Sequence, residues 1–117
     1  MTLAVSAPER GDLVWLEFSP QTGHEQAGRR PALVIQNDVG NRHAPTTIVA
    51  VMTTRVAAKS FPTEVRLPDA VFGKPSTVLA SQVFTLAQDR LVGAPLAALD
   101  CATMAEVDAA LKRSLGL

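Results

Sequence analysis

The sequence contains few of the residues that build metal sites or disulfide frameworks. Its 117 residues include one cysteine, Cys101, and two histidines, His24 and His43. A single cysteine excludes an internal disulfide and suits a reducing compartment. The two histidines lie in polar loop segments, where side chains are usually solvated, and neither has a second ligand at zinc-site spacing. We therefore expect no metal and no cofactor.

Long apolar runs and an excess of either charge are also missing. No apolar stretch approaches the roughly 18 residues that span a bilayer, and the N-terminal segment lacks the basic start of a signal peptide. We therefore expect a cytoplasmic protein without a membrane segment. Eleven basic residues balance eleven acidic ones, which argues against a general polyanion binder. Residues 29–60 carry five basic residues against a single acidic one, Asp38. This local excess favours either solvated loops or a local surface for phosphate.

Signatures of the common catalytic classes are absent as well. The sequence has no G-x-S-x-G nucleophile elbow and no local signal for a Ser-His-Asp triad. Walker-type and dinucleotide-binding glycine loops are also missing. Any catalysis must therefore proceed without a protein nucleophile of these kinds.

The composition that remains is that of one folded domain, 1–117, because a hydrophobic fraction of 47% and a charged fraction of 19% are ordinary for globular proteins. Short apolar segments alternate with polar loops, at 19–28 and 37–45 among others. They predict strands over Asp12–Phe18, Ala32–Gln36, Thr46–Met52, Thr63–Leu67 and Val78–Leu86. They leave open whether Arg90–Val92 forms a sixth strand.

The C-terminal segment changes to helical spacing at Met104, Val107, Leu111 and Leu115. Either Asp100 or a Thr103/Glu106 capping box is suited to start this helix. The sequence thus predicts a mainly β (α+β) fold, a small antiparallel barrel whose curled sheet closes so that no edge stays exposed. The terminal helix is expected to cover one side of it.

An arginine and two hydroxyls are the strongest chemical candidates. Arg30 immediately precedes Pro31, which fixes its backbone at the entry to a strand. Thr53 ends the next strand, and Thr54 follows it. If these strand ends share a rim, the guanidinium and the hydroxyl meet, and a guanidinium binds phosphate oxygens with two hydrogen bonds. Glu25 is a candidate base or a partner that holds Arg30 in place.

Simpler interpretations stay open for these residues. Arg30 and Glu25 would also suit a surface ion pair, and Thr53 a strand end without a role. Gln82, inside an apolar strand, fits either a buried amide or a side chain that recognises a base. Phe61 is a weaker candidate for stacking on a base.

The sequence resembles the MazF/PemK-type toxins of bacterial toxin–antitoxin pairs over nearly its whole length. The segments that carry the resemblance are Gly11–Trp15, Ser19–Pro20, Gly23–Gly28, Arg30–Val34, Gln36–Arg42 and Pro45–Ala50. The resemblance implies a small SH3-like barrel acting as a homodimer, with single-stranded RNA across the dimer interface. It also implies that the C-terminal segment of a cognate antitoxin covers the same groove.

The activity that the resemblance implies is metal-independent endoribonuclease cleavage at short RNA sequences, such as those of mRNA. The ribose 2′-hydroxyl attacks the adjacent phosphate, which leaves a 2′,3′-cyclic phosphate and a 5′-hydroxyl. Arg30 and Thr53 match the family's catalytic pair, and Glu25 stands beside them as a further catalytic candidate. The residues expected to bind RNA are Gln26, Arg29, Thr54 and Gln82.

Two alternatives compete with this hypothesis. A gyrase-inhibiting toxin of the same barrel fold, similar to CcdB, would place its function on an aromatic or acidic C-terminus, and Ser114–Leu117 offers neither. A plain protein-binding barrel makes no use of Arg30 and Thr53. Many relatives have an acidic residue where this chain has Ser81, so the role of that acid does not carry over. The sequence gives neither the RNA recognition word nor the antitoxin.

Overall fold

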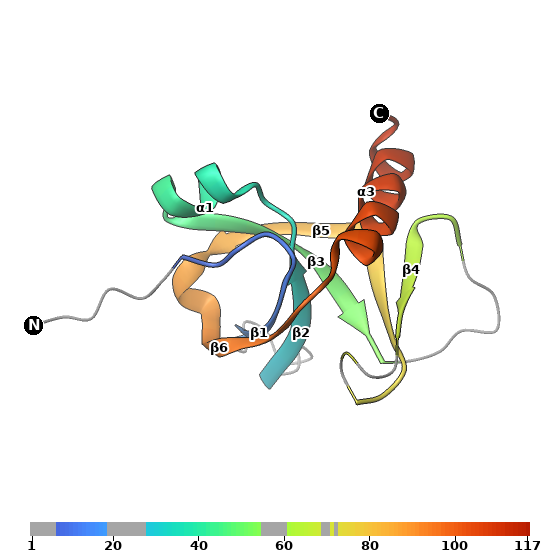
Figure 1. Ribbon diagram of the computed structural model, residues 1–117. Helices are drawn as coiled ribbons and strands as arrows, with labels where there is room; N and C mark the ends of the chain where they lie inside the picture. Colours follow the sequence, from blue (N-terminus) through green and yellow to red (C-terminus); the bar gives the residue numbers. More distant parts are fainter. Residues whose placement is uncertain (1–6, 19–27, 55–60, 69–70, 72) are drawn as a thin grey trace, which may run out of the picture.

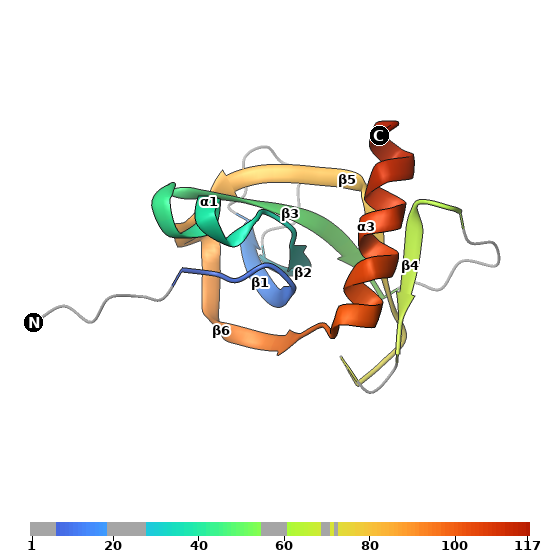
Figure 2. The same cartoon turned by 45° about the horizontal axis from the view of Figure 1, so that its top comes forward.

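The chain folds into a curved antiparallel sheet with one long helix across it (Figures 1 and 2). The computed structural model describes residues 7–18, 28–54, 61–68, 71 and 73–117. The strands are β1 (Asp12–Phe18), β2 (Gly28–Val34), β3 (Thr46–Thr53), β4 (Glu64–Leu67), β5 (Ser76–Ala87) and β6 (Leu91–Ala98). The helices are α1 (Asp38–His43), the short 3-10 helix η1 (Gln88–Arg90) and α3 (Cys101–Leu115).

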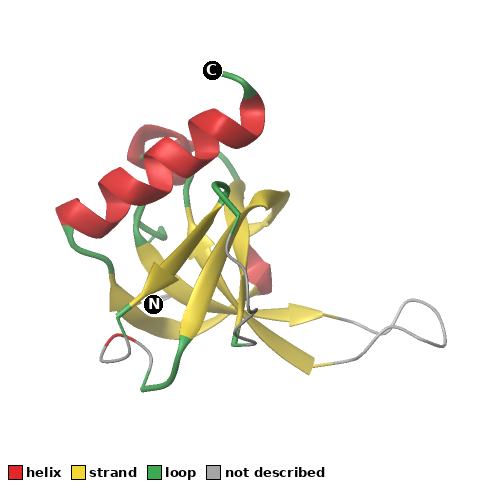
Figure 3. Ribbon diagram, turned by 90° about the vertical axis from the view of Figure 1, so that its right-hand side faces the viewer, coloured by secondary structure: helices red, strands yellow, loops and turns green. Residues whose placement is uncertain are grey.

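The predicted mainly β fold is confirmed, but the predicted closure of the sheet is wrong. The six strands are ordered β4-β5-β3-β2-β1-β6, and neighbours are antiparallel. In the described part of the chain, β4 and β6 are the two edges and do not pair with each other. The helix α3 lies across one face of the strands (Figure 3), where it packs against β5 and the edge strand β4.

Alternation along the central strands divides their apolar side chains between two clusters on opposite faces of the sheet. The first, here called the helix-side cluster, consists of buried residues of the sheet and of α3: Leu13, Leu33, Ala50, Met52, Val65, Leu67, Val78, Ala80, Met104, Val107 and Ala110. The second, the far-side cluster, consists of Val14, Leu16, Ala32, Val34 and Val49. Within β1, Leu13 therefore lies on one face of the sheet, and Val14 and Leu16 lie on the other.

The predicted C-terminal helix is confirmed, and Asp100 is its cap. The Asp100 carboxylate accepts a hydrogen bond from the Thr103 backbone N–H at 2.8 Å. This bond lowers the pKa of Asp100 below its usual range. Gly116 ends the helix with φ of 73°, a left-handed conformation that glycine adopts without strain. No helix in the described residues is long and apolar enough to cross a membrane.

Arg10 ties this helix to the end of β2. Its Nε donates to the backbone oxygen of Ile35 at 2.9 Å, and its Nη2 forms an ion pair with Asp108 of α3. The backbone N–H of Arg10 donates to Asp38 at the start of α1. One residue near the N-terminus thus links the end of β2 and the start of α1 to the C-terminal helix.

The loop predicted over residues 37–45 contains the helix α1 instead. Asn37 caps it by accepting from the Gly40 backbone N–H at 2.7 Å. Asn41 is 1% exposed and accepts from Thr47 Oγ1 at 2.7 Å and from Gln36 Nε2 at 2.9 Å. These contacts to other elements, which no apolar periodicity reveals, stabilise the short helix.

The remaining differences concern strand lengths. β2 begins at Gly28 rather than at Ala32 and ends at Val34, so Arg29 and Arg30 belong to the strand. Pairing with β1 explains the extension, because the β1 partners of residues 28–33 are residues 18–13. β5 begins at Ser76, two residues earlier than expected, and β6 continues to Ala98 along β1.

Candidate active site

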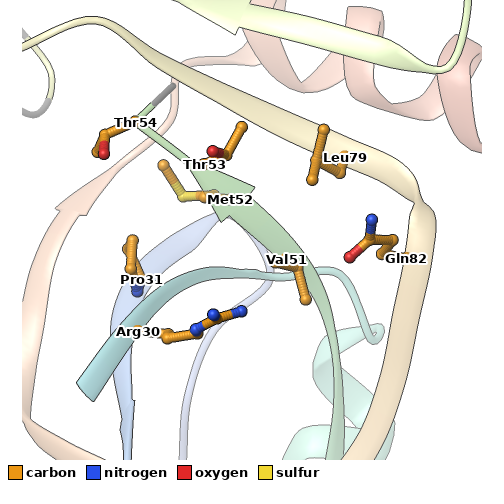
Figure 4. Close-up of a pocket in the computed structure, with 8 residues that line it drawn as sticks. All are labelled: Arg30, Pro31, Val51, Met52, Thr53, Thr54, Leu79 and Gln82. Carbon is orange, nitrogen blue, oxygen red and sulfur yellow. The ribbon is translucent and has the colours of Figure 1, made fainter. Parts of the chain in front are cut away.

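A pocket of about 550 Å³ opens where β2, β3 and β5 lie side by side (Figure 4). Its lining consists of one cation, two hydroxyls, one amide and apolar walls: Arg30, Pro31, Val51, Met52, Thr53, Thr54, Leu79 and Gln82. Figure 4 shows the ends of the Arg30 and Gln82 side chains pointing toward the middle of this space. The pocket therefore gathers hydrogen-bonding groups from three strands.

The ladder between β2 and β3 brings Arg30 and Thr53 together. Ala32 pairs with Val51 and Val34 with Val49. The pairing ends at Ala32 and Val51, and beyond it the two strands separate (Figure 4), so that Arg30 and Thr53 lie on two sides of the same pocket. The expected meeting of these two residues at one rim is what the structure shows, since both line the pocket.

A bulge in β5 brings Gln82 to the same place. The partner of Ala50 is Val83, whereas the partner of Val51 is Leu79, so residues 80–82 are extra in β5. Bulges change the direction in which side chains project. Here Ala80 is buried in the helix-side cluster, while Ser81 and Gln82 are exposed. The interpretation of Gln82 as a buried amide is therefore wrong, because its amide lines the open pocket.

The electrostatics of the pocket favour an anion. Among the described residues the one ion pair joins Arg10 to Asp108, so no carboxylate there neutralises the exposed Arg30. Thr53 and Thr54 supply hydroxyl groups to the same pocket. A guanidinium with nearby neutral donors is an arrangement that binds phosphate oxygens. The described residues also contain no group of three or more His, Cys, Asp and Glu side chains able to hold a metal.

The other predicted site residues are placed differently. Thr54 lines the pocket, immediately after the end of β3. Arg29 is exposed and pairs with Glu17 of β1, but it is not part of the pocket lining because it alternates with Arg30 along β2. Glu25 and Gln26 lie outside the described residues.

The apolar walls were not among the predicted site residues. Val51, Met52 and Leu79 read as ordinary strand positions, and the pocket exists partly because β5 departs from regular pairing beside them. The signal available in the sequence was the polar pair Ser81–Gln82 interrupting an apolar strand. Such an interruption predicts a local irregularity, but it does not indicate which way the side chains project.

Comparison with protein families adds a decisive observation to this geometry. Residues 9–115 match the family described as PemK-like, MazF-like toxins of type II toxin–antitoxin systems. The chain belongs to this family. The match includes every residue that lines the pocket.

Individual relatives support the assignment of this chain to the MazF-like toxins. Endoribonuclease EndoA of Bacillus subtilis (strain 168) is 41% identical over 111 residues, which cover 93% of this chain and 95% of the relative. The MazE–MazF complex (Form-II) from Deinococcus radiodurans contains a chain with a TM-score of 0.82 and 38% identity, covering 97% of this chain and 99% of that one.

A third relative is an endoribonuclease in complex with its cognate antitoxin from a mycobacterial species. It has a TM-score of 0.76 and 29% identity, and the match covers 95% of this chain and 97% of that chain. The alternative of a gyrase-inhibiting, CcdB-like toxin is not favoured, since the family match and the named relatives are MazF-like proteins and endoribonucleases.

Proposed function

We propose that the pocket around Arg30 and Thr53 is the site at which this MazF-like toxin cleaves single-stranded RNA. That the protein is an endoribonuclease follows from its family and from its 41% identity with an endoribonuclease. The observation that carries the assignment of the site is the convergence of a guanidinium, hydroxyls and an amide from three strands. In this proposal they bind the phosphate at the cleaved bond and the nucleotides beside it.

The proposed reaction needs no protein nucleophile. The ribose 2′-oxygen attacks phosphorus, the bond from phosphorus to the 5′-oxygen breaks, and the products are a 2′,3′-cyclic phosphate and a 5′-hydroxyl. The proton of the 2′-hydroxyl leaves to a base, for which Glu25 remains the candidate from the sequence, and a proton returns to the 5′-oxygen. Arg30 and Thr53 stabilise the charge that develops on the non-bridging oxygens.

The support for this division of roles is chemical. Arg30 supplies a planar pair of donors that matches two phosphate oxygens. Thr53 lines the same pocket from the neighbouring strand β3, which suits it to a second contact with the phosphate that Arg30 binds. Thr54 and Gln82, at two borders of the same pocket, suit contacts with the sugar and the bases, and Gln26 and Arg29 remain candidates for contacts farther along the RNA.

The experiment is cleavage of a long unstructured RNA by the purified protein in the presence of a chelator, with the ends of the products characterised. We expect cleavage to persist with 2′,3′-cyclic phosphate and 5′-hydroxyl ends. Arg30→Ala should lower the rate about 1,000-fold and Thr53→Ala about 10- to 100-fold. Thr53→Ser, which keeps the hydroxyl, should recover most of the loss.

Two controls separate the site from the rest of the surface. Arg66→Ala removes an exposed cation from the edge strand β4, and Thr46→Ala removes a hydroxyl from the opposite end of β3. Both should leave the rate unchanged. Cleavage that stops with chelator, or full activity in Arg30→Ala and Thr53→Ala, would refute the proposed mechanism.

The proposed setting of this reaction follows the same family. We propose that the toxin acts in the cytoplasm as a homodimer with RNA lying across the dimer interface, and that a cognate antitoxin inhibits it by placing a C-terminal segment in that groove. Solved relatives that are bound to a cognate antitoxin or to MazE support this proposal. Loss of RNA cleavage on titration with the cognate antitoxin would be the direct check.

A further inference from the structure

Phe84 is a large aromatic side chain that the fold leaves exposed near the pocket. Its exposed fraction is 54%, although it lies within β5, a long strand of the sheet. The other aromatic side chain with comparable exposure in the described part of the chain is Phe61, at 62%. An aromatic ring turned to solvent in the middle of a paired strand is not explained by the packing of the core.

The register of the sheet determines the face on which Phe84 lies. Phe84 pairs with Val49, a completely buried member of the far-side cluster. Val49 alternates with Val51 and Thr53 along β3, so all three project from the same face. Phe84 therefore lies on the face from which Arg30 and Thr53 line the pocket.

Phe84 also follows Gln82 by two residues along β5. The irregular part of β5 ends at Gln82, because Val83 and Phe84 pair regularly with Ala50 and Val49. Two residues of a regular strand span about 6.6 Å. Phe84 thus lies about one such step along β5 from Gln82, at the point where regular pairing with β3 resumes.

We propose that Phe84 is a stacking platform for a nucleobase of the RNA, next to the nucleotide whose phosphate Arg30 and Thr53 bind. This inference rests on the proposed function of the pocket. Single-stranded RNA exposes its bases, and aromatic side chains bind them by stacking, largely without regard to base identity. Phe84 extends the site beyond the cleaved bond and contributes affinity, while the polar groups of the pocket select the sequence.

The test uses an RNA of the cleaved sequence together with a series of the same RNA in which one base at a time is removed. Binding is measured in the Arg30→Ala background, so that the RNA stays intact. Loss of one stacking contact should weaken binding about 5- to 100-fold. With Phe84 present, one particular abasic position should show this loss, and Phe84→Leu should weaken intact RNA by the same factor.

The decisive result is coupling between the residue and the base. In Phe84→Leu, removal of the base at that position should have no further effect, while the losses at other positions remain. Phe84→Trp should restore the affinity for intact RNA. It should also make binding sensitive again to removal of the base at that position. Phe61→Leu tests the competing stacking candidate from the sequence. Phe61 is similarly exposed but lies in the segment before β4 and does not line the pocket, so this substitution should change neither quantity.

Several outcomes would overturn the inference. One is an unchanged series of abasic losses in Phe84→Leu. Another is weakened binding accompanied by loss of the homodimer in sedimentation, which would make Phe84 a contact between two copies of the chain. A third is weakening by Phe61→Leu rather than by Phe84→Leu. If the parent protein with Arg30 cleaves no RNA at all, the proposed function fails. If the parent cleaves RNA but Phe84→Leu leaves RNA binding unchanged, the stacking role alone is contradicted.

Discussion

The two faces of the sheet are built from the same strands, but one is covered by a helix and the other carries an open pocket. On one face the helix-side cluster is covered by α3, whose Met104, Val107 and Ala110 are buried against the strands. On the other face the far-side cluster is smaller, and at one end it gives way to the pocket of Arg30 and Thr53. The same ladders therefore support a sealed core and an open site.

The difference teaches how a small domain separates stability from chemistry. Side chains alternate along β3, so Ala50 is buried in the helix-side cluster while Val51 and Thr53 line the pocket on the open face. Burial on the covered face fixes the strands, and the strands in turn fix the positions of the pocket residues. Substitutions on the covered face should therefore change stability, and substitutions in the pocket should change activity.

The clearest separation of activity from stability is expected at Arg30. Arg30→Lys keeps the positive charge but loses the planar pair of donors, and we expect the cleavage rate to fall by about 100-fold or more. Because the side chain is exposed, the midpoint of urea unfolding should not change. Single-turnover cleavage and equilibrium unfolding on the same preparation measure both quantities. A lysine variant with full activity would show that charge alone is required.

The opposite effect, a loss of stability without a loss of activity, is expected at Met104. Its side chain is 9% exposed within the helix-side cluster, and Met104→Ala should lower the free energy of unfolding by about 2–4 kcal/mol. RNA cleavage per folded molecule, measured well below the unfolding temperature, should remain at the parent level. Leu115→Ala, in the same helix but 62% exposed, is the control and should lose little stability. A large loss of activity in folded Met104→Ala would contradict the independence of the two faces.

A smaller effect is expected at the bulge of β5. Gln82→Ala removes one exposed amide from the pocket, and loss of a single hydrogen bond should lower the specificity constant by about 3- to 10-fold. The preferred cleavage sequence should relax at one position, which sequencing of the cleavage products would reveal. Ser81→Ala alters the neighbouring bulge residue, which does not line the pocket, and should leave the cleavage pattern unchanged.

The smallest effect is expected at the cap of α3, and it depends on pH. Because the folded-state pKa of Asp100 is lowered, the cap contributes stability above the usual value of about 3.8 and loses it as the pH falls through the lowered pKa. Asp100→Ala should therefore lower the melting temperature at pH 7, by less than Met104→Ala does. The difference from the parent should shrink in strong acid. Glu106→Ala should have no comparable effect, since the carboxylate that caps α3 is that of Asp100, which accepts from the Thr103 backbone N–H.

Much of this architecture could be predicted, and the failures have physical causes. Strands with clear alternation, such as β1 and β3, and the periodic helix α3 are found at or close to their predicted bounds. The short helix α1 was missed because it depends on hydrogen bonds to Gln36, Thr47 and other residues outside it. The openness of the sheet was missed because no local pattern records that α3 covers its end.

Some features of the candidate site could likewise be predicted from the sequence, and others could not. Arg30 and Thr53 were predicted to meet because each stands at the end of a strand, and strand ends of neighbours are brought together by pairing. The openness of Gln82 and the exposure of Phe84 were not predictable, since both depend on where β5 leaves regular pairing. Glu25 and Gln26 remain predictions, because they lie outside the described residues.

An open sheet creates a hazard of aggregation, and the edge strand β6 carries features that oppose it. An unpaired edge offers backbone groups that the strand of another molecule is able to join. The pairing of β6 with β1 shifts register between Val92 and Ala97, and within that irregular stretch Gly93 adopts φ of 72° and Pro95 has no backbone N–H to donate. A regular strand from a second molecule finds no continuous partner there. The interrupted edge thus opposes strand-to-strand association between copies of an open sheet.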